Sequence, residues 1–251
     1  MKNTSILFGR LMKHISRSPD TIITVAIMPV AMMLMFVYVF GGALKTSLPG
    51  NVNYVNYQLP GILMMTIASG TAYTAFRLWG DKKKGLFSRF NSMPISRSSA
   101  LWAHILASLV SNILTVAIIF LIALIMGFRP SANVSQWLAI AGILTLYSLA
   151  LTWVAAIAGL AAKSVEGASA FSYPLIFLPF LSSAFVPTET MPKAVRIFAE
   201  NQPVTSIVES LRALLNSEPV GSEIWIALAW CVGIMIVAWF LAMRVYRSRI
   251  A

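Results

Sequence analysis

Six stretches of the sequence contain no Asp, Glu, Lys or Arg, and each is at least 20 residues long. They cover residues 21–44, 46–76, 98–128, 130–162, 167–188 and 224–243. A helix needs about 20 residues to cross the ~30 Å hydrocarbon core of a bilayer. The pattern therefore predicts an all-α membrane protein, one domain over residues 1–251, with six transmembrane helices. We place these at about 21–43, 59–76, 101–126, 137–161, 169–187 and 223–243.

The composition supports a membrane protein and excludes other classes. Hydrophobic residues make up 58% of the chain and charged residues only 11%, whereas about a quarter of the residues in a soluble domain are charged. This apolar content excludes a disordered chain. Cys231 is the single cysteine, so a disulfide-stapled scaffold is excluded as well.

Two of the six predicted spans are irregular. The second charge-free stretch begins with polar residues between Asn51 and Tyr57, which we interpret as an external loop that enters the bilayer near Leu59. The fifth contains Pro174 and Pro179. Proline removes a helix hydrogen bond, so we expect a kink or a break there, tolerated where neighbouring structure satisfies the freed carbonyls.

The basic residues predict the orientation, because loops rich in Lys and Arg stay in the cytoplasm. Of the 19 Lys and Arg residues, 14 fall on the side that holds both termini: Lys2, Arg10, Lys13, Arg17, Arg77, Lys82, Lys83, Lys84, Arg89, Arg97, Lys163, Arg244, Arg247 and Arg249. The other side has no net charge. Both termini are predicted to be cytoplasmic, and the net charge of +11 reflects topology and anionic lipids as partners rather than nucleic acid.

The first 20 residues are predicted to form an interfacial helix. Leu7, Phe8 and Leu11 fall on one helical face, and Arg10 and Lys13 on the other. A cleavable signal peptide is not expected, because the apolar run starts only at residue 21 and is long enough to span a bilayer.

The predicted spans lack the residues that secondary transporters and membrane enzymes need. No formal charge lies inside them apart from Glu223 at an edge, whereas secondary transporters usually carry ionisable groups along the ion path. Catalytic and zinc-binding motifs and the phosphate-binding loop of nucleotide hydrolases are missing. We expect no catalytic residue, no metal and no cofactor in this chain, so any energy must come from another polypeptide.

The cytoplasmic loop at 81–97 has more features than a topology signal needs. After Lys82–Lys84, Leu86, Phe87 and Phe90 form an apolar face on a short basic helix that stops before Pro94. Exposed aromatic residues on such a loop favour docking to a partner protein or contact with the membrane surface.

The run G-L-F-x-R-F-x-S-M-P-I-S-R, from Gly85 to Arg97, resembles the corresponding loop of ABC-2 type transporter permeases, most closely those of the daunorubicin-resistance type. The resemblance implies that this loop is the coupling helix that contacts a separate ABC-type ATPase subunit, which binds ATP and Mg²⁺. The implied coupling residues are Asp81, Gly85, Phe87, Arg89, Phe90, Pro94 and Arg97. Many family members carry further Glu residues here, where this chain has Lys82–Lys84 and Ser88.

The segment after the fifth predicted span carries a second pattern. Pro192 is expected to open one short helix, and Ser206 and Glu209 to form the capping box of another. The second helix has an apolar face, so we expect it to lie against the outer leaflet or dip into it. The run from F-V-P-x-x-x-M-P through N-Q-P-V-T to L-R-A-L resembles the same family, in which short external helices cap the outer end of the pathway.

Six residues within the spans are candidates for the substrate pathway: Met28, Met32, Asn112, Tyr147, Pro174 and Pro179. Methionines offer an adaptable surface to an apolar substrate, and the polar groups could line a path. Packing against lipid or neighbouring helices is the competing interpretation.

Taken with the resemblance, these patterns predict the permease half of an ATP-driven exporter in a bacterial or archaeal plasma membrane, paired with a second copy as a homodimer. The uncharged spans favour an amphipathic drug-like or lipid-like substrate. A polysaccharide or glycolipid exporter of the same family, a self-powered secondary transporter and a non-transporting membrane scaffold remain alternatives.

Overall fold

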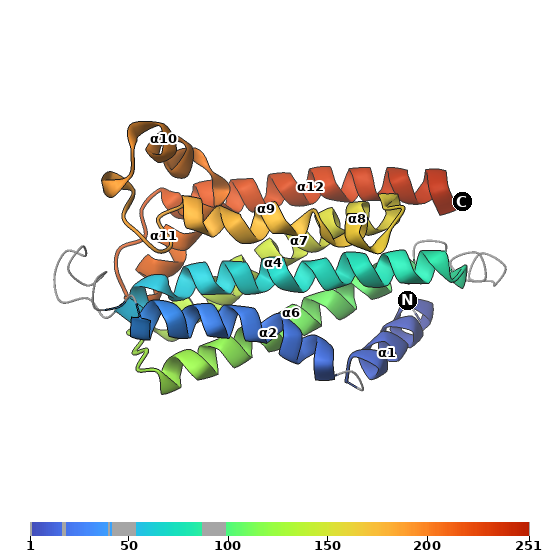
Figure 1. Cartoon of the computed structure of the whole chain (residues 1–251), viewed down its shortest axis with the longest axis horizontal. Helices are drawn as coiled ribbons and strands as arrows, with labels where there is room; N and C mark the ends of the chain where they lie inside the picture. The colour runs from blue at the N-terminus through green and yellow to red at the C-terminus, as the bar shows by residue number, and fades with distance from the viewer. Residues whose placement is uncertain (1, 17–18, 40, 42–53, 87–98, 251) are drawn as a thin grey trace.

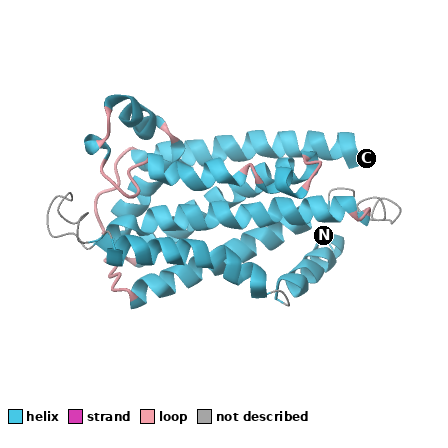
Figure 2. Ribbon diagram, viewed as in Figure 1, coloured by secondary structure: helices cyan, strands magenta, loops and turns pink. Residues whose placement is uncertain are grey.

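A computed structural model describes residues 2–16, 19–39, 41, 54–86 and 99–250, and these residues form helices joined by short turns, with no strand among them (Figures 1 and 2). The long helices are α4 (Tyr54–Lys83), α6 (Ser99–Ile125), α7 (Val134–Ala161) and α12 (Glu223–Ile250). The N-terminal part forms α1 (Lys2–Ser16), α2 (Pro19–Leu34) and the π-helical turn η1 (Met35–Val39). Between α7 and α12 lie α8 (Val165–Ser169), α9 (Ser172–Phe177), the 3-10 turns η2 (Leu178–Leu181) and η3 (Thr188–Thr190), α10 (Lys193–Asn201) and α11 (Pro203–Leu215).

The four long helices are long and apolar enough to cross a membrane. Two shorter apolar helical stretches, Val25–Val39 and Val165–Leu181, correspond to the first and fifth predicted spans. In Figure 1, α1 and the C-terminal end of α12 lie at the same end of the bundle, where α4 also ends at Lys83. The predicted interfacial helix at the N-terminus corresponds to α1, which packs against α6.

The second and fifth spans differ from their predicted form. Helix α4 begins at Tyr54, so its polar start is helical and not an external loop. The predicted span 169–187 is not one helix but a sequence of α8, α9, η2 and turns. Pro174 lies in the first turn of α9 and Pro179 near the start of η2, positions where a missing backbone N–H costs little, so the prolines start short helices rather than kink a long one.

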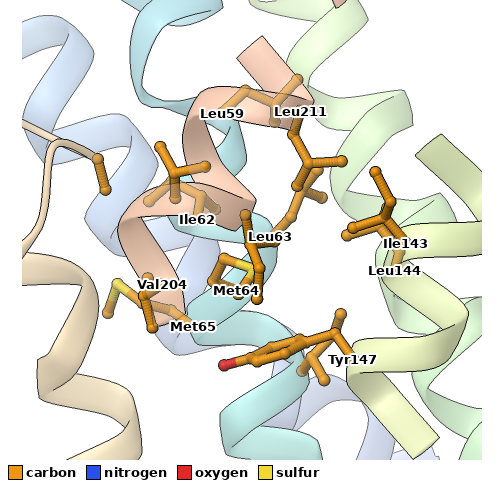
Figure 3. Close-up of a cluster of buried hydrophobic side chains, with 14 of the residues drawn as sticks. Leu59, Ile62, Leu63, Met64, Met65, Ile143, Leu144, Tyr147, Val204 and Leu211 are labelled. Carbon is orange, nitrogen blue, oxygen red and sulfur yellow. The ribbon is translucent and has the colours of Figure 1, made fainter. Parts of the chain in front are cut away.

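Helix α4 forms the centre of the bundle, with α2, α6, α7, α9 and α11 packed around it. Its side chains from Leu59 to Met65 meet Ile143, Leu144 and Tyr147 of α7 and Val204 and Leu211 of α11 in one apolar cluster (Figure 3). A second apolar cluster at the other end joins Leu78, Leu101, Trp153 and Ala242. Small residues permit close approach: a Cβ on Gly159 would lie 2.6 Å from the carbonyl oxygen of Ala75.

Helix α11 lies inside the bundle, which corrects the expectation that it rests against the outer leaflet. Its apolar residues Val204, Ile207, Val208, Leu211 and Leu214 are at most 4% exposed, because α4, α7 and α12 cover them. The predicted capping box is also wrong. The helix opens three residues earlier, at Pro203, and Ser206 lies within it, where its carbonyl accepts a hydrogen bond from Ser210. Pro192 precedes α10 as expected.

Candidate functional site

The C-terminal end of α4 is tied to two neighbouring helices. Asp81 Oδ2 lies 3.0 Å from His104 Nε2 on α6, and the two side chains are 24% and 7% exposed. Lys82 Nζ donates to the carbonyl of Leu160, at 2.6 Å, and to that of Ala162, at 3.4 Å, where α7 ends. A cation at a helix C-terminus is favoured by the helix dipole and by the unpaired carbonyls there. The loop therefore leaves the bundle from a fixed point.

Gly85 ends α4 in a left-handed turn with φ +66°. The turn is closed by the Lys84 N–H on the Gly80 carbonyl, at 3.0 Å, and by the Gly85 N–H on the Lys82 carbonyl, at 3.1 Å. Glycine adopts this conformation without steric cost, which explains its place at the helix end.

The structure describes only two of the seven predicted coupling residues, Asp81 and Gly85. Asp81 bonds within the chain to α6, rather than projecting freely toward a partner, and Gly85 terminates α4. Phe87, Arg89, Phe90, Pro94 and Arg97 lie outside the described residues, so their contact with an ATPase stays a prediction. Sequence reasoning missed His104. The available signal was a histidine at the start of the third predicted span, near the same predicted membrane boundary as Asp81.

The six pathway candidates do not form one site. Met28 on α2 and Pro174 on α9 are exposed, Met32 is partly buried, and Tyr147 and Pro179 are buried in the packed interior. Asn112 on α6 donates from Nδ2 to Ser148 Oγ of α7 at 2.9 Å. Gly70 on α4 makes room for it, since a Cβ there would lie 2.1 Å from Asn112 Oδ1. Asn112 on α6 therefore contacts both α4 and α7.

Asn112 also lines a cavity of about 320 Å³ between α6 and α7. Its polar lining comes from Asn112, Thr145 and Ser148, whereas Val116, Phe120, Trp137 and Leu144 are among the apolar residues of its wall. None of the lining residues is charged. Such a mixture suits a small amphipathic molecule, since ligand sites are mostly apolar with a few placed polar groups.

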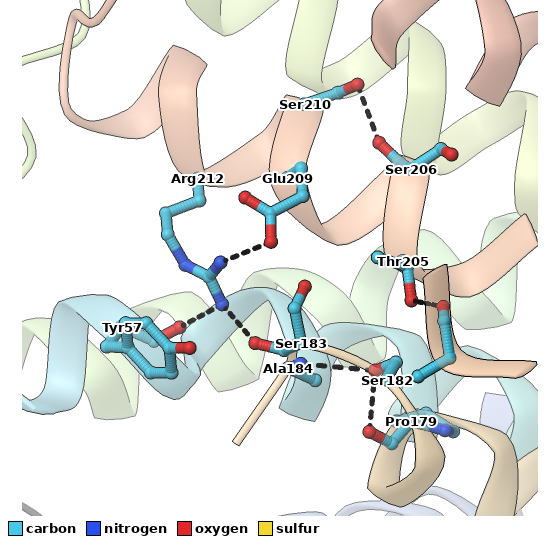
Figure 4. A network of polar contacts seen from close by, with 11 residues as sticks. Tyr57, Pro179, Ser182, Ser183, Ala184, Thr205, Ser206, Glu209, Ser210 and Arg212 are labelled. Atoms are coloured by element: carbon cyan, nitrogen blue, oxygen red, sulfur yellow. Dashed lines mark hydrogen bonds and ion pairs between the residues drawn. The ribbon is translucent and has the colours of Figure 1, made fainter. Parts of the chain in front are cut away.

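At the other end of the bundle, side chains from α4, α11 and the turn between α10 and α11 hold the backbone that follows α9. Figure 4 shows the contacts of Arg212. Arg212 of α11 donates from Nη2 to the carbonyls of Ser183, at 2.7 Å, and Tyr57, at 3.3 Å. Its Nη1 pairs with Glu209 Oε1 at 3.0 Å, and the guanidinium lies 3.9 Å from the centroid of the Tyr57 ring. The side chain is only 12% exposed, so its charge is neutralised inside the protein.

Gln202 and Tyr54 hold further carbonyls of the same segment. Gln202 Nε2 donates to Leu181 O at 2.6 Å and to Leu178 O at 3.2 Å, and the Tyr54 hydroxyl donates to Phe185 O at 3.3 Å. Sequence analysis included Gln202 and Arg212 in the runs N-Q-P-V-T and L-R-A-L but gave them no role. The missed signal was an arginine on the apolar helix after a proline-broken span, because a buried cation needs acceptors.

In the described part of the chain, no three His, Cys, Asp or Glu side chains gather where a metal ion could be held. At one end of the bundle, Asp81 and Lys82 thus bond the end of α4 to α6 and α7. At the other end, side chains donate hydrogen bonds to backbone carbonyls between Leu178 and Phe185.

The sequence matches the family described as ABC-2 type transporter over residues 2–216. It is 29% identical over 247 residues to a daunorubicin resistance ABC transporter permease protein of Streptomyces coeruleorubidus, with 96% of this chain and 84% of that protein covered. A probable doxorubicin resistance ABC transporter permease protein of Mycobacterium tuberculosis is 25% identical over 240 residues, covering 93% and 84%. A putative transport permease of Cyanophora paradoxa is 25% identical over 217 residues, covering 84% and 73%.

Proposed function

Because the chain belongs to the ABC-2 type transporter family, we propose that it is the membrane permease subunit of an exporter driven by a separate ATP-hydrolysing subunit. The family match over residues 2–216 is the observation that carries this proposal. We propose further that both termini and the loop at 81–97 face the cytoplasm, in the plasma membrane of a bacterium or archaeon, and that a second copy of the chain completes the pathway as a homodimer.

Helix α4 is suited to carry force from the loop to the far side of the membrane. It is a continuous 30-residue helix, about 45 Å long at 1.5 Å per residue. Near its C-terminal end Asp81 and Lys82 fix the start of the loop to α6 and α7. Near its N-terminal end Tyr54 donates to Phe185 O in the segment after α9, and the Tyr57 carbonyl accepts from Arg212 of α11. A push of the ATPase on the loop would therefore tilt α4 and alter the contacts at its outer end.

The substrate that we propose is amphipathic and drug-like or lipid-like. Two relatives are named for resistance to daunorubicin and doxorubicin, and the uncharged cavity between α6 and α7 has a polar part formed by Asn112 and Ser148. A polysaccharide or glycolipid exporter of the same family would need a longer hydrophilic surface than the residues of this cavity provide.

A self-powered secondary transporter is the second candidate, and the Asp81–His104 pair is the observation that favours it. The contact places a carboxylate and an imidazole together between two helices, and ionisable groups of these types form proton relays in transporters. Transport of this kind would follow a proton gradient without nucleotide.

Affinity purification of the tagged chain from its native membrane tests the proposed function. We expect an ABC-type ATPase subunit to co-purify in equal amount and to hydrolyse ATP with Mg²⁺. Recovery of the chain alone from membranes solubilised in a mild detergent, together with proton-driven transport by that sample, would favour the second candidate. A membrane scaffold would bind a partner but produce no nucleotide-dependent flux.

A further inference from the structure

The backbone from Leu178 to Val186 leaves the regular helix inside the protein. Ser182, Ser183, Ala184 and Phe185 are all buried. Buried backbone carbonyls outside a helix need other donors, because no water or lipid group replaces the missing helix bond. Side chains supply them here: Gln202, Arg212 and Tyr54 donate to the carbonyls of Leu178, Leu181, Ser183 and Phe185. Figure 4 shows the bond from Arg212 to Ser183.

The bonds that hold this segment are unequal on its two sides. Toward α11 and the turn that precedes it there are three: Gln202 to Leu181 O at 2.6 Å, Gln202 to Leu178 O at 3.2 Å and Arg212 to Ser183 O at 2.7 Å. Toward α4 there is one, from Tyr54 to Phe185 O at 3.3 Å. Hydrogen bonds weaken with distance, so the segment is held more firmly by Gln202 and Arg212 than by α4.

Packing against α4 is close but involves small groups. A Cβ on Gly61 would lie 2.6 Å from the Cβ of Ala184, so the two backbones approach at a position that only glycine permits. The Phe185 ring stacks on Phe36 of η1 at 4.7 Å. Separation of the segment from α4 would break dispersion contacts and the long hydrogen bond from Tyr54 to Phe185 O, but no ion pair.

The arrangement of the segment against α4 also leaves polar atoms unpaired. Gln202 Oε1, Arg212 Nε and Ser183 Oγ are buried and have no hydrogen-bond partner among the described residues. Unpaired buried polar atoms disfavour the state that contains them. An arrangement in which this region meets water would satisfy them, which lowers the cost of opening.

We propose that Gln202 and Arg212 are positioning residues that hold the segment 178–186 in its observed form, the 3-10 turn η2 followed by non-helical backbone, and that this segment is the outer gate of the permease. The gate opens by separating from α4 while it stays bound to Gln202 and Arg212. This inference rests on the proposed function, because it assigns the outer step of the same transport cycle.

A cysteine introduced at position 183 reports on the gate. The Ser183 hydroxyl has no described partner, and only the backbone carbonyl of this residue bonds Arg212, so Ser183→Cys leaves the bonds to the segment intact. The background is Cys231→Ala, which removes the single natural thiol. The purified permease in lipid nanodiscs is treated with a membrane-impermeant maleimide, without any ATPase.

We expect slow labelling at position 183 in this Ser183→Cys parent, and labelling about ten-fold faster when Arg212→Met removes the donor to Ser183 O and Tyr57 O. Tyr54→Phe, which removes one long bond and keeps the ring, should accelerate labelling a few-fold, by about two to four. Arg212→Lys should restore slow labelling in part, since a lysine still donates to a carbonyl.

Two controls separate a gate from general unfolding. A reporter at Ser210→Cys, on α11 and buried in the parent, should stay unlabelled with Arg212→Met. Arg196→Met, which breaks the exposed ion pair with Glu200, should leave labelling at position 183 unchanged. Equal labelling at position 183 in the parent, Arg212→Met and Tyr54→Phe would overturn the assignment, and so would simultaneous labelling at position 210.

A second arm links the segment to transport. With the co-purified ATPase, trapping with ATP and vanadate should change the labelling rate at position 183 by at least about three-fold relative to the nucleotide-free complex. If the labelling without ATPase gives the expected rates but nucleotide has no effect, Arg212 holds the segment and the gate assignment fails. If no ATPase is recovered at all, the proposed function fails, while the labelling without ATPase still tests whether Arg212 holds the segment.

Discussion

Asp81 near the C-terminal end of α4 and His104 on α6 lie 3.0 Å apart, from Oδ2 to Nε2, and both are largely shielded from solvent. The contact joins the helix at the centre of the bundle to the helix that follows the loop at 81–97. Because the loop starts and ends on these two helices, the pair holds its two ends in a defined relation.

A double-mutant cycle measures this contact. Asp81→Ala and His104→Ala should each destabilise the protein, and the double variant should lose roughly 1 kcal/mol less than the sum of the two, because the second substitution breaks no further bond. Chemical or thermal unfolding of the detergent-solubilised protein gives the values. Simple additivity would mean that the two side chains do not interact.

Lys82 and Lys83 are a matched pair for testing the tether on α7. Lys82→Met removes the donor to Leu160 O and Ala162 O at a helix C-terminus and should cost about 1 kcal/mol. Lys83 lies over the Trp79 ring, with Nζ 4.9 Å from the centroid. Lys83→Met should cost about 0.5 kcal/mol, since an exposed cation–π contact is weak. Melting temperatures in one detergent compare the two, and the reverse order would contradict the tether.

Gly70 and Asn112 should show compensation. Gly70→Ala places a methyl group 2.1 Å from Asn112 Oδ1 and should destabilise the protein by about 1–3 kcal/mol. Adding Asn112→Ala vacates that space, so the double variant should be more stable than Gly70→Ala alone. Gly142→Ala is the control, because nothing lies within 4 Å of its added Cβ and alanine favours a helix. A double variant that is less stable than Gly70→Ala would contradict the observed packing.

Gly85 should matter for coupling more than for insertion. Proline is confined to φ near −65°, whereas Gly85 has φ +66°, so Gly85→Pro must redirect the start of the loop. We expect normal membrane insertion, retained ATPase activity and loss of export, with Gly80→Ala as a control in open space. Arg89→Glu should likewise uncouple hydrolysis from export. Unaltered export in both Gly85→Pro and Arg89→Glu would exclude the coupling role of this loop.

The long helices were predictable because an uncharged stretch of more than 20 residues in lipid must satisfy its own backbone hydrogen bonds, which a helix does. Charge-free runs place both ends of α6 and α7 to within three residues and the start of α12 at Glu223, whereas α12 continues past the predicted end at residue 243 to Ile250. The boundary at Tyr54 was missed because Gln58 and Tyr54 are polar, yet both are buried and bond to protein backbone: Gln58 Nε2 donates to Met33 O at 3.4 Å. Hydropathy cannot distinguish a polar residue in a loop from one satisfied in a helix.

The candidate site was only partly predictable, because its key contacts join residues far apart in the sequence. Pro174 and Pro179 indicated a broken span, but the donors that permit the break are Gln202, Arg212 and Tyr54, up to 131 positions away from the carbonyls that they hold. The amphipathic face of α11 was recognised, and its assignment to lipid was wrong, because an apolar stripe carries no information on whether lipid or protein covers it.

ATP dependence of transport tests the central claim most directly. The permease and its co-purified ATPase are reconstituted into proteoliposomes, and movement of fluorescent amphipathic drug-like and lipid-like probes across the membrane is followed with and without ATP and Mg²⁺. We predict transport that requires both subunits and ATP hydrolysis and that Gly85→Pro abolishes. Transport by the permease alone, driven by a proton gradient and indifferent to ATP, would contradict the account.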